Sequence, residues 1–206
     1  MKNLAAKRVC LAMLAFALVL SGCQSKEASD GSAADKSTAE SAADSQSTEE
    51  ETVEIYDTKA LFGEFVTYTQ EGEEVSQEIF AEADLTMVNI WGTFCSPCIA
   101  EMPDLGELAE EYADKNVAIV GIISDVYEAG NETAQQIIDQ TGADYTHLIH
   151  SEDIYNNFLR LIQVVPTTVF VNSEGMRVGD VIMGSKDKEA WIQEIEKRLE
   201  AVTDEE

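Results

Sequence analysis

Residues 87–103, MVNIWGTFCSPCIAEMP, join an apolar run to a pair of cysteines with two residues between them. The apolar, β-branched run begins at Leu85 and ends at Trp91, which predicts a buried strand. A short turn with Gly92 follows. Pro97 fits the first turn of a helix, where a backbone N–H would have no partner. The stretch therefore predicts a strand, a turn and a helix that begins at the cysteines.

This helix start gives Cys95 and Cys98 different environments. We predict Cys95 at the N-cap and Cys98 one turn inside. A helix N-terminus offers free N–H groups and a positive dipole end, which lower the pKa of a thiol and favour the reactive thiolate. Cys95 would then be the exposed nucleophile. Cys98, which faces inward, would be the resolving thiol that attacks the mixed disulfide and releases the product.

Two other interpretations of the cysteine pair compete with redox chemistry. One is half of a zinc site, but a structural zinc usually needs four Cys or His ligands. The remaining cysteines, Cys10 and Cys23, lie in the N-terminal leader, and His147 and His150 could complete a set only across a long gap. The other is a structural disulfide, which would stabilise little because it closes a two-residue loop. Redox chemistry is favoured, and we expect no metal.

Residues 1–23 indicate a secretory signal. A basic start precedes the apolar run 9–20, which is too short for a typical membrane span, and small residues follow it. Residues 20–23, LSGC, resemble the lipobox of bacterial lipoproteins. The resemblance implies cleavage before Cys23 and a diacylated cysteine at the new N-terminus. We expect an extracytoplasmic protein, anchored to the bacterial cell membrane through lipid on Cys23. An ordinary secreted protein is the alternative.

Residues 24–52 are small or polar, with no aromatic and no large aliphatic side chain. Such a segment cannot bury enough surface to offset its ordering entropy, so we expect a disordered acidic tether with a root-mean-square span of roughly 30 Å. It would present the folded domain, residues 53–206, to partners at the membrane, or act as a passive spacer through a cell wall.

The charge of the chain excludes some classes of partner. It has 40 acidic and 13 basic residues, a formal charge of −27, and every acidic residue follows Cys23. Nucleic acids and anionic lipid surfaces both attract positively charged proteins. We therefore expect no nucleic acid partner, and a membrane contact that depends on the lipid alone.

Residues 53–206 alternate between strand and helix patterns. Continuous apolar runs, such as 117–123, predict strands covered on both faces. Strands are expected at 85–91, 117–123, 145–149, 166–172 and 176–183, helices at 96–114, 131–141, 152–161 and 186–201, and a hairpin at 64–75. This order predicts a three-layer α/β fold, with a mixed central sheet flanked by helices.

The order of elements resembles the thioredoxin superfamily over about residues 60–200. Within it, residues 88–103, with VPT at 165–167, are similar to the TlpA/ResA-like membrane-anchored thiol-disulfide oxidoreductases of lipoprotein form. The resemblance implies a thioredoxin-like fold with an N-terminal β-hairpin and a helical insert after Ile123. It also implies a redox-active disulfide as the only redox group, without a cofactor.

The resemblance assigns roles around the cysteines. Pro166 matches a proline that is cis in the superfamily, in a loop beside Cys95. Val165 would pair its backbone groups with the client chain around the substrate cysteine. Phe94 stands where tryptophan is usual and would supply an apolar surface. The client-binding residues that we expect are Trp91, Phe94, Pro97, Val165 and Pro166.

Glu101 is the third candidate catalytic residue. It lies three residues after Cys98, on the same helix face, and matches a glutamate that the family places near the buried cysteine. A carboxylate there could accept the Cys98 proton as that thiol attacks. The alternative is a solvent-facing helix glutamate. Asn89 stands where thioredoxin has a buried aspartate, and an amide cannot carry the proton.

The favoured function is a protein-disulfide reductase that acts on oxidised client proteins and is kept reduced by a membrane electron donor of the thiol-transporting type. Apocytochrome c and a methionine sulfoxide reductase are candidate clients. The alternative is a disulfide-forming oxidase, but Ser-Pro between the cysteines adds no charge that would stabilise the thiolate, which favours a reducing potential. Peroxiredoxins carry a Pro-x-x-x-Thr-x-x-Cys motif, in which the threonine lies three residues before the cysteine. Thr93 lies only two residues before Cys95, and no proline precedes it at the needed spacing, so a peroxiredoxin-like peroxidase is disfavoured. A ligand-binding lipoprotein is disfavoured by the presence of the cysteine pair.

Overall fold

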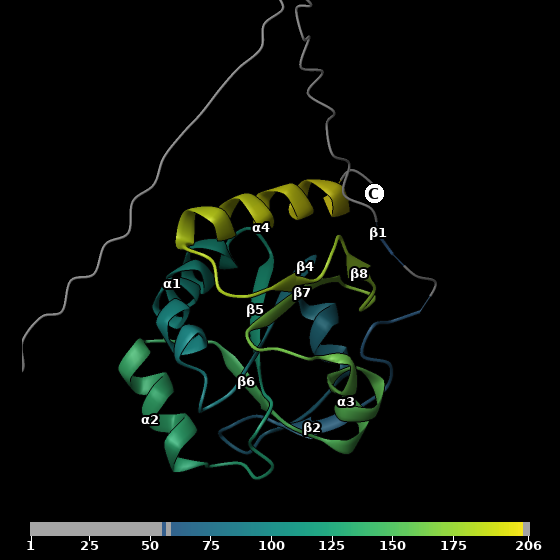
Figure 1. The fold of residues 1–206 in the computed structure, drawn as a ribbon. Coiled ribbons are helices and arrows are strands. Elements are labelled where there is room, and N and C mark those ends of the chain that lie inside the picture. The colour runs from purple at the N-terminus through teal and green to yellow at the C-terminus, as the bar shows by residue number, and fades with distance from the viewer. Residues whose placement is uncertain (1–54, 57–58, 204–206) are drawn as a thin grey trace, which may run out of the picture. The chain divides into compact units, whose positions relative to one another are not determined.

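The structure, a computed structural model, describes residues 55–56 and 59–203 (Figure 1). The predicted signal 1–23, with its lipidated Cys23, and the predicted tether 24–52 lie outside these residues. Within the part that is described, no helix is both long and apolar enough to cross a membrane.

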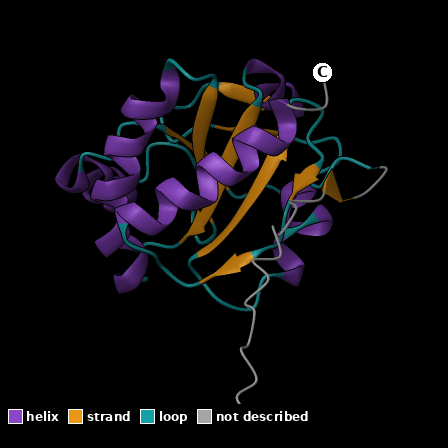
Figure 2. Cartoon of the chain, turned by 90° about the horizontal axis from the view of Figure 1, so that it is seen from above, coloured by secondary structure: helices purple, strands orange, loops and turns teal. Residues whose placement is uncertain are grey.

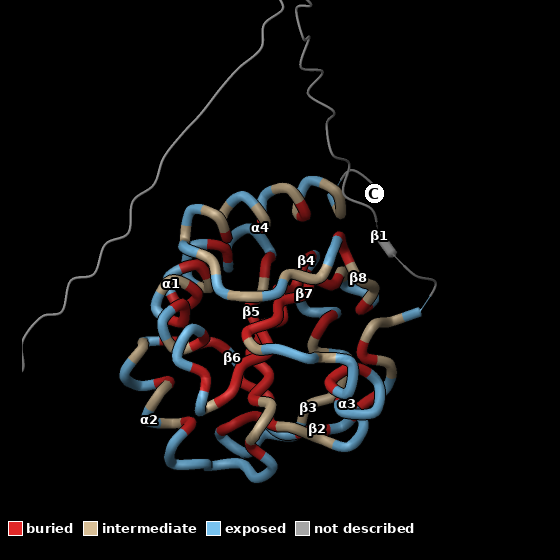
Figure 3. Tube along the Cα trace, viewed as in Figure 1, coloured by how far each residue is buried: buried red, intermediate tan, exposed pale blue. Residues whose placement is uncertain are grey.

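A mixed sheet forms the middle layer of the described residues, with seven strands in the order β1-β8-β7-β4-β5-β6 and β9 paired to β7. Strands β4, β5 and β6 are parallel, whereas β7 is antiparallel to β4, β8 and β9. The strands are β1 (Ile55–Tyr56), β4 (Leu85–Trp91), β5 (Val117–Ile123), β6 (Thr146–Ile149), β7 (Thr167–Asn172), β8 (Arg177–Val178) and β9 (Ile182–Met183). β4 lies at the centre and is buried along its whole length (Figure 3).

Helices cover both faces of this sheet. On one face α1 and α4 pack over the strands, with α2 against α1, and Figure 2 shows α4 lying across the sheet. The other face is covered by α3, two 3-10 helices and the hairpin β2–β3. The helices are α1 (Ser96–Ala113), α2 (Glu132–Thr141), α3 (Glu152–Asn157), α4 (Lys188–Thr203) and the 3-10 helices η1 (Gln77–Glu82) and η2 (Leu159–Leu161). The predicted three-layer, thioredoxin-like α/β fold is confirmed.

The side chains of β4 alternate between the two faces, as strand geometry requires. Leu85 and Met87 belong to the apolar cluster under α1 and α4, whereas Val88 and Ile90 belong to the cluster on the other face. Because both faces are covered, the strand is apolar at nearly every position rather than at every second one. This is why β4 and β5 have the bounds that the sequence predicts.

The predicted N-terminal hairpin is formed by β2 (Val66–Tyr68) and β3 (Glu74–Ser76), which pair antiparallel as a separate small sheet. The hairpin lies against β6, because the Gln70 N–H donates to the His147 carbonyl oxygen at 2.7 Å. This contact covers part of the outer strand β6, which would otherwise be an open edge of the main sheet.

The single strand predicted at 176–183 is wrong, because this segment forms two short strands. Gly179, with a φ of +73°, separates β8 from β9. The Arg198 side chain, from α4, occupies the break: its Nε donates to the Val178 carbonyl oxygen at 3.1 Å and its Nη2 to that of Asp180 at 3.4 Å. The chain can leave the β7 ladder there because a buried arginine binds the freed carbonyl groups.

The helix predicted at 152–161 is also interrupted. α3 ends at Asn157, and the next residue, Phe158, leaves the helical region with a φ of −137° before η2 begins. Phe158 is 4% exposed and its ring centroid lies 4.8 Å from that of Phe62. The break therefore accompanies the burial of an aromatic ring under the second face of the sheet.

Candidate active site

The loop between β4 and α1 sets the geometry of the two cysteines. Cys95 is the N-cap of α1, with extended backbone angles (φ −94°, ψ 94°), and a proline occupies the first turn. The Cys95 N–H donates to the Gly92 carbonyl oxygen at 3.0 Å, so the loop is a tight turn. The structure thus places Cys95 and Pro97 where the sequence predicts a helix start.

Cys95 and Cys98 form a disulfide, and their environments differ. The Cys98 N–H lies 3.3 Å from Cys95 Sγ and points at it. In the reduced protein this N–H and the helix N-terminus favour a negative charge on Cys95 Sγ, which lowers the pKa of a thiol. No backbone N–H is arranged in the same way around Cys98 Sγ among the described residues, so Cys95 is the better candidate for the thiolate.

Access to the two sulfurs differs less than the sequence predicts. Cys98 is 0% exposed, as expected for an inner thiol, but Cys95 is only 5% exposed. Its neighbours form the surface instead: the Phe94 side chain is 71% exposed, and Pro97 is exposed as well. Of the two cysteines, only Cys95 keeps any exposed surface.

The peptide bond between Val165 and Pro166 is cis. Pro166 is buried and precedes β7, and its carbonyl oxygen accepts a hydrogen bond from the Gly184 N–H at 2.9 Å. The Thr167 hydroxyl donates to the Val164 carbonyl oxygen at 2.8 Å. These two hydrogen bonds hold the backbone of the cis-proline loop next to β7 and β9. The Val164 side chain in this loop is half exposed.

A groove of about 490 Å³ opens between the loop that carries the cysteines and the cis-proline loop. Its lining includes Phe94, Tyr127, His150, Tyr155, Val164 and Val165. The His150 ring lies between the two tyrosines, with ring centroids 4.4 Å from Tyr127 and 5.4 Å from Tyr155. The fold therefore brings the expected client-binding residues Phe94 and Val165 to one apolar groove, although they are far apart in the sequence.

Trp91 does not share this position. Its side chain is 0% exposed and belongs to the same apolar cluster as both cysteines. A direct contact between Trp91 and a client is therefore impossible in this conformation. Its expected part in client binding stays a prediction and would act through the residues that cover it.

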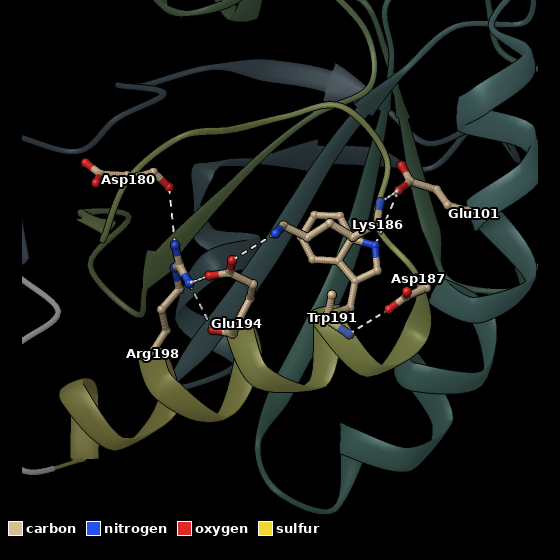
Figure 4. Close-up of polar contacts among 8 residues, drawn as sticks. Glu101, Asp180, Lys186, Asp187, Trp191, Glu194 and Arg198 are labelled. Carbon is tan, nitrogen blue, oxygen red and sulfur yellow. Dashed lines mark hydrogen bonds and ion pairs between the residues drawn. The ribbon is translucent and has the colours of Figure 1, made fainter. Parts of the chain in front are cut away.

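Glu101 lies on the buried face of α1, at 3% exposure, and its two oxygens accept three hydrogen bonds, of which Figure 4 shows those from Lys186 and Trp191. Oε1 accepts from Asn89 Nδ2 at 3.1 Å. Oε2 accepts from the Lys186 backbone N–H at 3.1 Å and from Trp191 Nε1 at 3.3 Å. Burial raises the pKa of Glu101, and these three donors oppose the increase. The solvent-facing alternative for Glu101 is wrong, whereas its catalytic role stays a prediction.

The Redoxin family profile matches residues 48–190 of the chain, which is more than half of its length. The chain belongs to the redoxin family.

Among curated proteins, this redoxin is similar to the thiol-disulfide oxidoreductase ResA of Oceanobacillus iheyensis, with 32% identity over 120 residues that cover 56% of the chain and 60% of ResA. The match to the ResA of Halalkalibacterium halodurans is at 30% identity and also covers 60% of that protein. The chain thus matches about three fifths of the length of these relatives. The thiol:disulfide interchange protein DsbE of Pseudomonas fluorescens is 28% identical over 70% of the chain and 76% of DsbE. The predicted ResA-like member of the thioredoxin superfamily is confirmed.

Solved structures support the fold. A thiol:disulfide interchange protein of the thioredoxin family from Chlorobium tepidum superposes with a TM-score of 0.59 at 22% identity, over 71% of the chain and 99% of that protein. StoA from Bacillus subtilis superposes with a TM-score of 0.52 at 20% identity, over 65% of the chain and 97% of StoA. At this level of identity the likeness concerns the fold alone.

In this redoxin the loop that carries Cys95 is held by residues that sequence analysis missed. Ser124, just after β5, donates from its N–H and from its hydroxyl to the Trp91 carbonyl oxygen, both at 2.8 Å. Asp125 accepts from the Thr93 N–H at 3.0 Å and from the Thr93 hydroxyl at 2.6 Å. The only signal in the sequence was their place at the end of a parallel strand next to β4, an edge where functional groups often gather.

The partners of Glu101 were missed for a similar reason. Trp191 lies in the last helix and is buried, and its indole N–H binds a carboxylate 90 residues away in the sequence. Asn89 donates to Thr168 Oγ1 at 3.0 Å as well as to Glu101, and its Oδ1 has no hydrogen-bond partner in the described part of the chain. A polar residue in a buried strand signals such a network without naming its members.

The described residues contain no group of three or more His, Cys, Asp and Glu side chains placed to hold a metal ion. The two histidines of the zinc alternative have other contacts: His147 binds the Trp91 indole and the Ala143 carbonyl oxygen, and His150 packs between two tyrosines. The sulfur atoms of Cys95 and Cys98 are joined to each other in a disulfide.

Proposed function

We propose that this redoxin is a thiol-disulfide oxidoreductase that reduces disulfides of client proteins through Cys95 and Cys98. The observation that carries the proposal is the Cys95–Cys98 disulfide at the N-terminus of α1, beside a groove that the cis-proline loop borders. The names of the relatives, ResA and DsbE, agree with this chemistry, although the chain matches only part of the ResA proteins.

The reaction begins with the reduced dithiol. The Cys95 thiolate attacks one sulfur of a client disulfide, so that a mixed disulfide forms and the other client sulfur leaves as a thiolate, which takes up a proton. The Cys98 thiolate then attacks Cys95 Sγ and releases the first client sulfur. Two electrons pass from the dithiol to the client, and the Cys95–Cys98 disulfide is the product. A membrane electron donor of the thiol-transporting type would reduce it again.

Glu101 would accept the Cys98 proton during the second attack. Cys98 is fully buried, and burial disfavours its thiolate, so this step needs a nearby base. The carboxylate lies one helical turn further along α1, on the same side. Because burial raises the pKa of Glu101, the proton transfer from a thiol is less uphill than it would be to an exposed glutamate.

The groove would bind the client chain around its cysteine. Phe94 and Pro97 offer exposed apolar surface beside Cys95, and the cis-proline loop offers the backbone groups of Val165. Apolar surface of this extent on a strongly acidic protein supports a contact with an extended peptide segment. Apocytochrome c and a methionine sulfoxide reductase are candidate clients, and the negative charge argues against nucleic acids.

The setting of the reaction is part of the proposal. The LSGC sequence at residues 20–23 supports lipidation of Cys23 and anchoring to the outer side of the bacterial cell membrane, with residues 24–52 as a tether. Labelling of the cells with radioactive palmitate tests the anchor: the full-length protein should be labelled, and a Cys23→Ala variant should not.

A trapping experiment tests the function. A Cys98→Ala variant can form the mixed disulfide but cannot resolve it, so it should accumulate covalent complexes with its clients. A reductant should cleave these complexes. The matched Cys95→Ala variant should trap none. Equal trapping by both variants would contradict the assignment of Cys95 as nucleophile.

The direction of the reaction has its own test. Ser96 and Pro97 place no charge between the cysteines, so we expect a reduction potential below about −200 mV, on the reducing side of the series that runs from thioredoxin to DsbA. Equilibration with glutathione redox buffers measures this potential. A value close to about −120 mV, that of DsbA, would favour the disulfide-forming oxidase instead.

A further inference from the structure

A buried histidine forms a hydrogen bond beneath the site. His147, on β6, is 0% exposed, and its Nδ1 lies 3.2 Å from Nε1 of Trp91. Its other ring nitrogen, Nε2, lies 2.9 Å from the Ala143 carbonyl oxygen. The indole N–H can only donate and the carbonyl can only accept. Nδ1 is therefore the acceptor and Nε2 the donor, which defines a neutral ring in a single tautomer.

The intervening strand leaves room for this bond. Gly121 of β5 stands opposite His147 on one side and opposite Asn89 of β4 on the other. A Cβ atom at Gly121 would lie 2.2 Å from His147 Nδ1 and 3.1 Å from Trp91 Nε1. Only glycine at this position lets the imidazole reach across β5 to the indole.

Trp91 connects this bond to the nucleophile. It is the last residue of β4, and the turn that follows it ends at Cys95. Its carbonyl oxygen is fixed by Ser124, and its side chain packs in one apolar cluster with Cys95 and Cys98. The orientation of the indole therefore bears both on the start of the cysteine loop and on the packing under the disulfide.

We propose that His147 is a positioning residue for Cys95: its neutral ring holds the Trp91 indole, and through it the loop that keeps Cys95 Sγ at the N-terminus of α1. The proposal rests on the proposed function, in which Cys95 is the attacking thiol. Without the bond, the indole can turn and the loop gains freedom, so that the Cys98 N–H meets Cys95 Sγ for a smaller part of the time. The Cys95 thiolate then loses part of its stabilisation and reacts more slowly.

The ring remains neutral under the conditions of such a reaction. Burial lowers the pKa of His147 to about 4, although the bond to Ala143 and the carboxylates of Glu71 and Asp144 act in the opposite direction. The other aromatic neighbour, Tyr145, has its ring centroid 4.4 Å from that of His147. At pH 7 the acceptor at Nδ1 is thus present in essentially every molecule.

Two matched variants separate the bond to Trp91 from the packing of the ring. His147→Asn places an amide group near the position of Nδ1, where its oxygen can still accept from Trp91 Nε1, but it cannot reach the Ala143 carbonyl oxygen. His147→Gln places its amide near the position of Nε2, where it can donate to Ala143 but leaves the indole without an acceptor. Both variants shorten or thin the same side chain, so both lose packing.

The measurement is the rate at which iodoacetamide alkylates Cys95 in the reduced full-length protein at pH 7, located by peptide mass spectrometry. We expect the wild-type rate for His147→Asn and a rate roughly two- to fivefold lower for His147→Gln, the range of an interaction at a helix terminus. The NMR signal of the Trp91 indole N–H should keep the downfield position of a hydrogen-bonded indole in His147→Asn and move upfield in His147→Gln. The chain has two tryptophans, so a Trp91→Phe variant assigns this signal.

Equal Cys95 rates in the two variants, whether both normal or both slow, would overturn the proposal, because only the bond to Trp91 distinguishes them. If neither variant folds, Trp91→Phe carries the test, since it removes the donor and keeps His147. It must lower the Cys95 rate to the same extent, and an unchanged rate overturns the proposal. If Cys98 is alkylated before Cys95 in the wild type, the proposed function fails instead, whatever the His147 variants do.

Discussion

The two faces of the central sheet are both buried, but they are built from different side chains. On the face under α1 and α4, three polar residues and a glycine form a row across four neighbouring strands, in which Asn89 stands opposite Thr168 on one side and Gly121 on the other, and Gly121 stands opposite His147. On the other face the same strands contribute mainly valine, isoleucine and leucine, with Thr86 and Thr167 as buried polar side chains. Both faces are thus mainly apolar, and the face under α1 and α4 carries in addition a row of residues that contacts Glu101 and Trp91.

The comparison of the two faces shows where buried polar groups are tolerated. A buried polar group costs about 1–3 kcal/mol when it lacks a partner, so an apolar row would make a more stable sheet. The polar row lies on the side of the cysteine pair, where it binds Glu101 and Trp91. The opposite face instead packs phenylalanine rings, with the Phe62 ring centroid 5.4 Å from that of Phe80 and 4.8 Å from that of Phe158. We therefore expect substitutions in the polar row to change chemistry more than stability, and substitutions among the phenylalanine rings of the other face to do the reverse.

The largest effect is expected at the cysteines, on the first face. Cys95→Ser should reduce insulin disulfide reduction to the uncatalysed background, because Cys98, the other thiol of α1, is fully buried inside the first turn. Cys98→Ser should also stop turnover, but it should accumulate mixed disulfides, since only the attacking thiol is needed to form them. Non-reducing gel electrophoresis separates the two outcomes. Mixed disulfides on Cys98 in the Cys95→Ser variant would reverse the roles.

The second prediction tests the apolar face. Phe62 is 1% exposed and touches two other phenylalanine rings, so Phe62→Ala should lower the free energy of unfolding by about 3–5 kcal/mol. Cys95 alkylation at pH 7 in the folded protein should keep its wild-type rate. Phe62→Leu, which fills more of the cavity, serves as the milder control. A Cys95 rate that falls in parallel with stability in both variants would show that the two faces do not act separately.

The sequence predicted the elements whose signals are local. The bounds of β4 and β5 follow from continuous apolar runs between turns, and the helix start at Cys95 follows from Pro97. The split of β8 from β9 could not be predicted, because it depends on the buried Arg198 of α4, whose side chain binds carbonyl groups far away in the sequence. Periodicity indicates which residues face the core, but it does not indicate which of them meet.

In the candidate site, too, the residues in short motifs were predictable, whereas contacts between distant residues were not. The cysteine pair and its cis proline were recognised from short motifs. Glu101 was named as a candidate, but an exposed glutamate was an equally simple interpretation in so acidic a chain. Its burial depends on donors from the segment around α4, Lys186 and Trp191 (Figure 4), and on Asn89 of β4. The bond between His147 and Trp91 joins two strands that are not neighbours, which no pattern within either strand records.

The third prediction concerns Glu101 as a base on the polar face. Glu101→Gln should slow the resolution of the mixed disulfide by roughly 10- to 100-fold near neutral pH, because the amide cannot accept the Cys98 proton. Cys95 alkylation should barely change, since that thiol depends on the helix terminus. Stopped-flow measurement of the resolution step gives the first rate, and iodoacetamide the second.

A matched control is Glu110→Gln, which removes an exposed carboxylate from the same helix. It should leave both rates unchanged. If Glu101→Gln resolves mixed disulfides as fast as the wild type across pH 6 to 9, Glu101 serves only to join α1 to α4.

The smallest expected effect is on the pH dependence of stability, and it bears on why Glu101 is tolerated on the polar face. Burial raises the pKa of Glu101 in the folded protein above its ordinary value of 4.5. The folded state therefore binds the proton more tightly than the unfolded state. The stability that this residue contributes is fully present below pH 4.5 and is lost as the pH rises through the folded-state pKa.

A glutamine at this position does not ionise, so its contribution to stability does not fall as the pH rises. In Glu101→Gln the side-chain oxygen can still accept from Lys186 and Trp191, while the new NH₂ group takes the place of Oε1, which accepts from Asn89 Nδ2. The Asn89 amide must therefore turn over, so that its Oδ1, which has no partner among the described residues, accepts from this NH₂ group. The free energy of unfolding of the wild type minus that of Glu101→Gln should therefore fall as the pH rises from 4 to 8. Urea denaturation of both proteins at each pH measures this difference, in which the shared effects of the other carboxylates cancel. Glu110→Gln again controls for the loss of one charge. A difference that rises with pH would mean that the three donors outweigh burial and hold Glu101 as a stabilising anion. The carboxylate would then be a poor base for Cys98, and the polar face would owe its glutamate to the joining of α1 and α4 rather than to proton transfer.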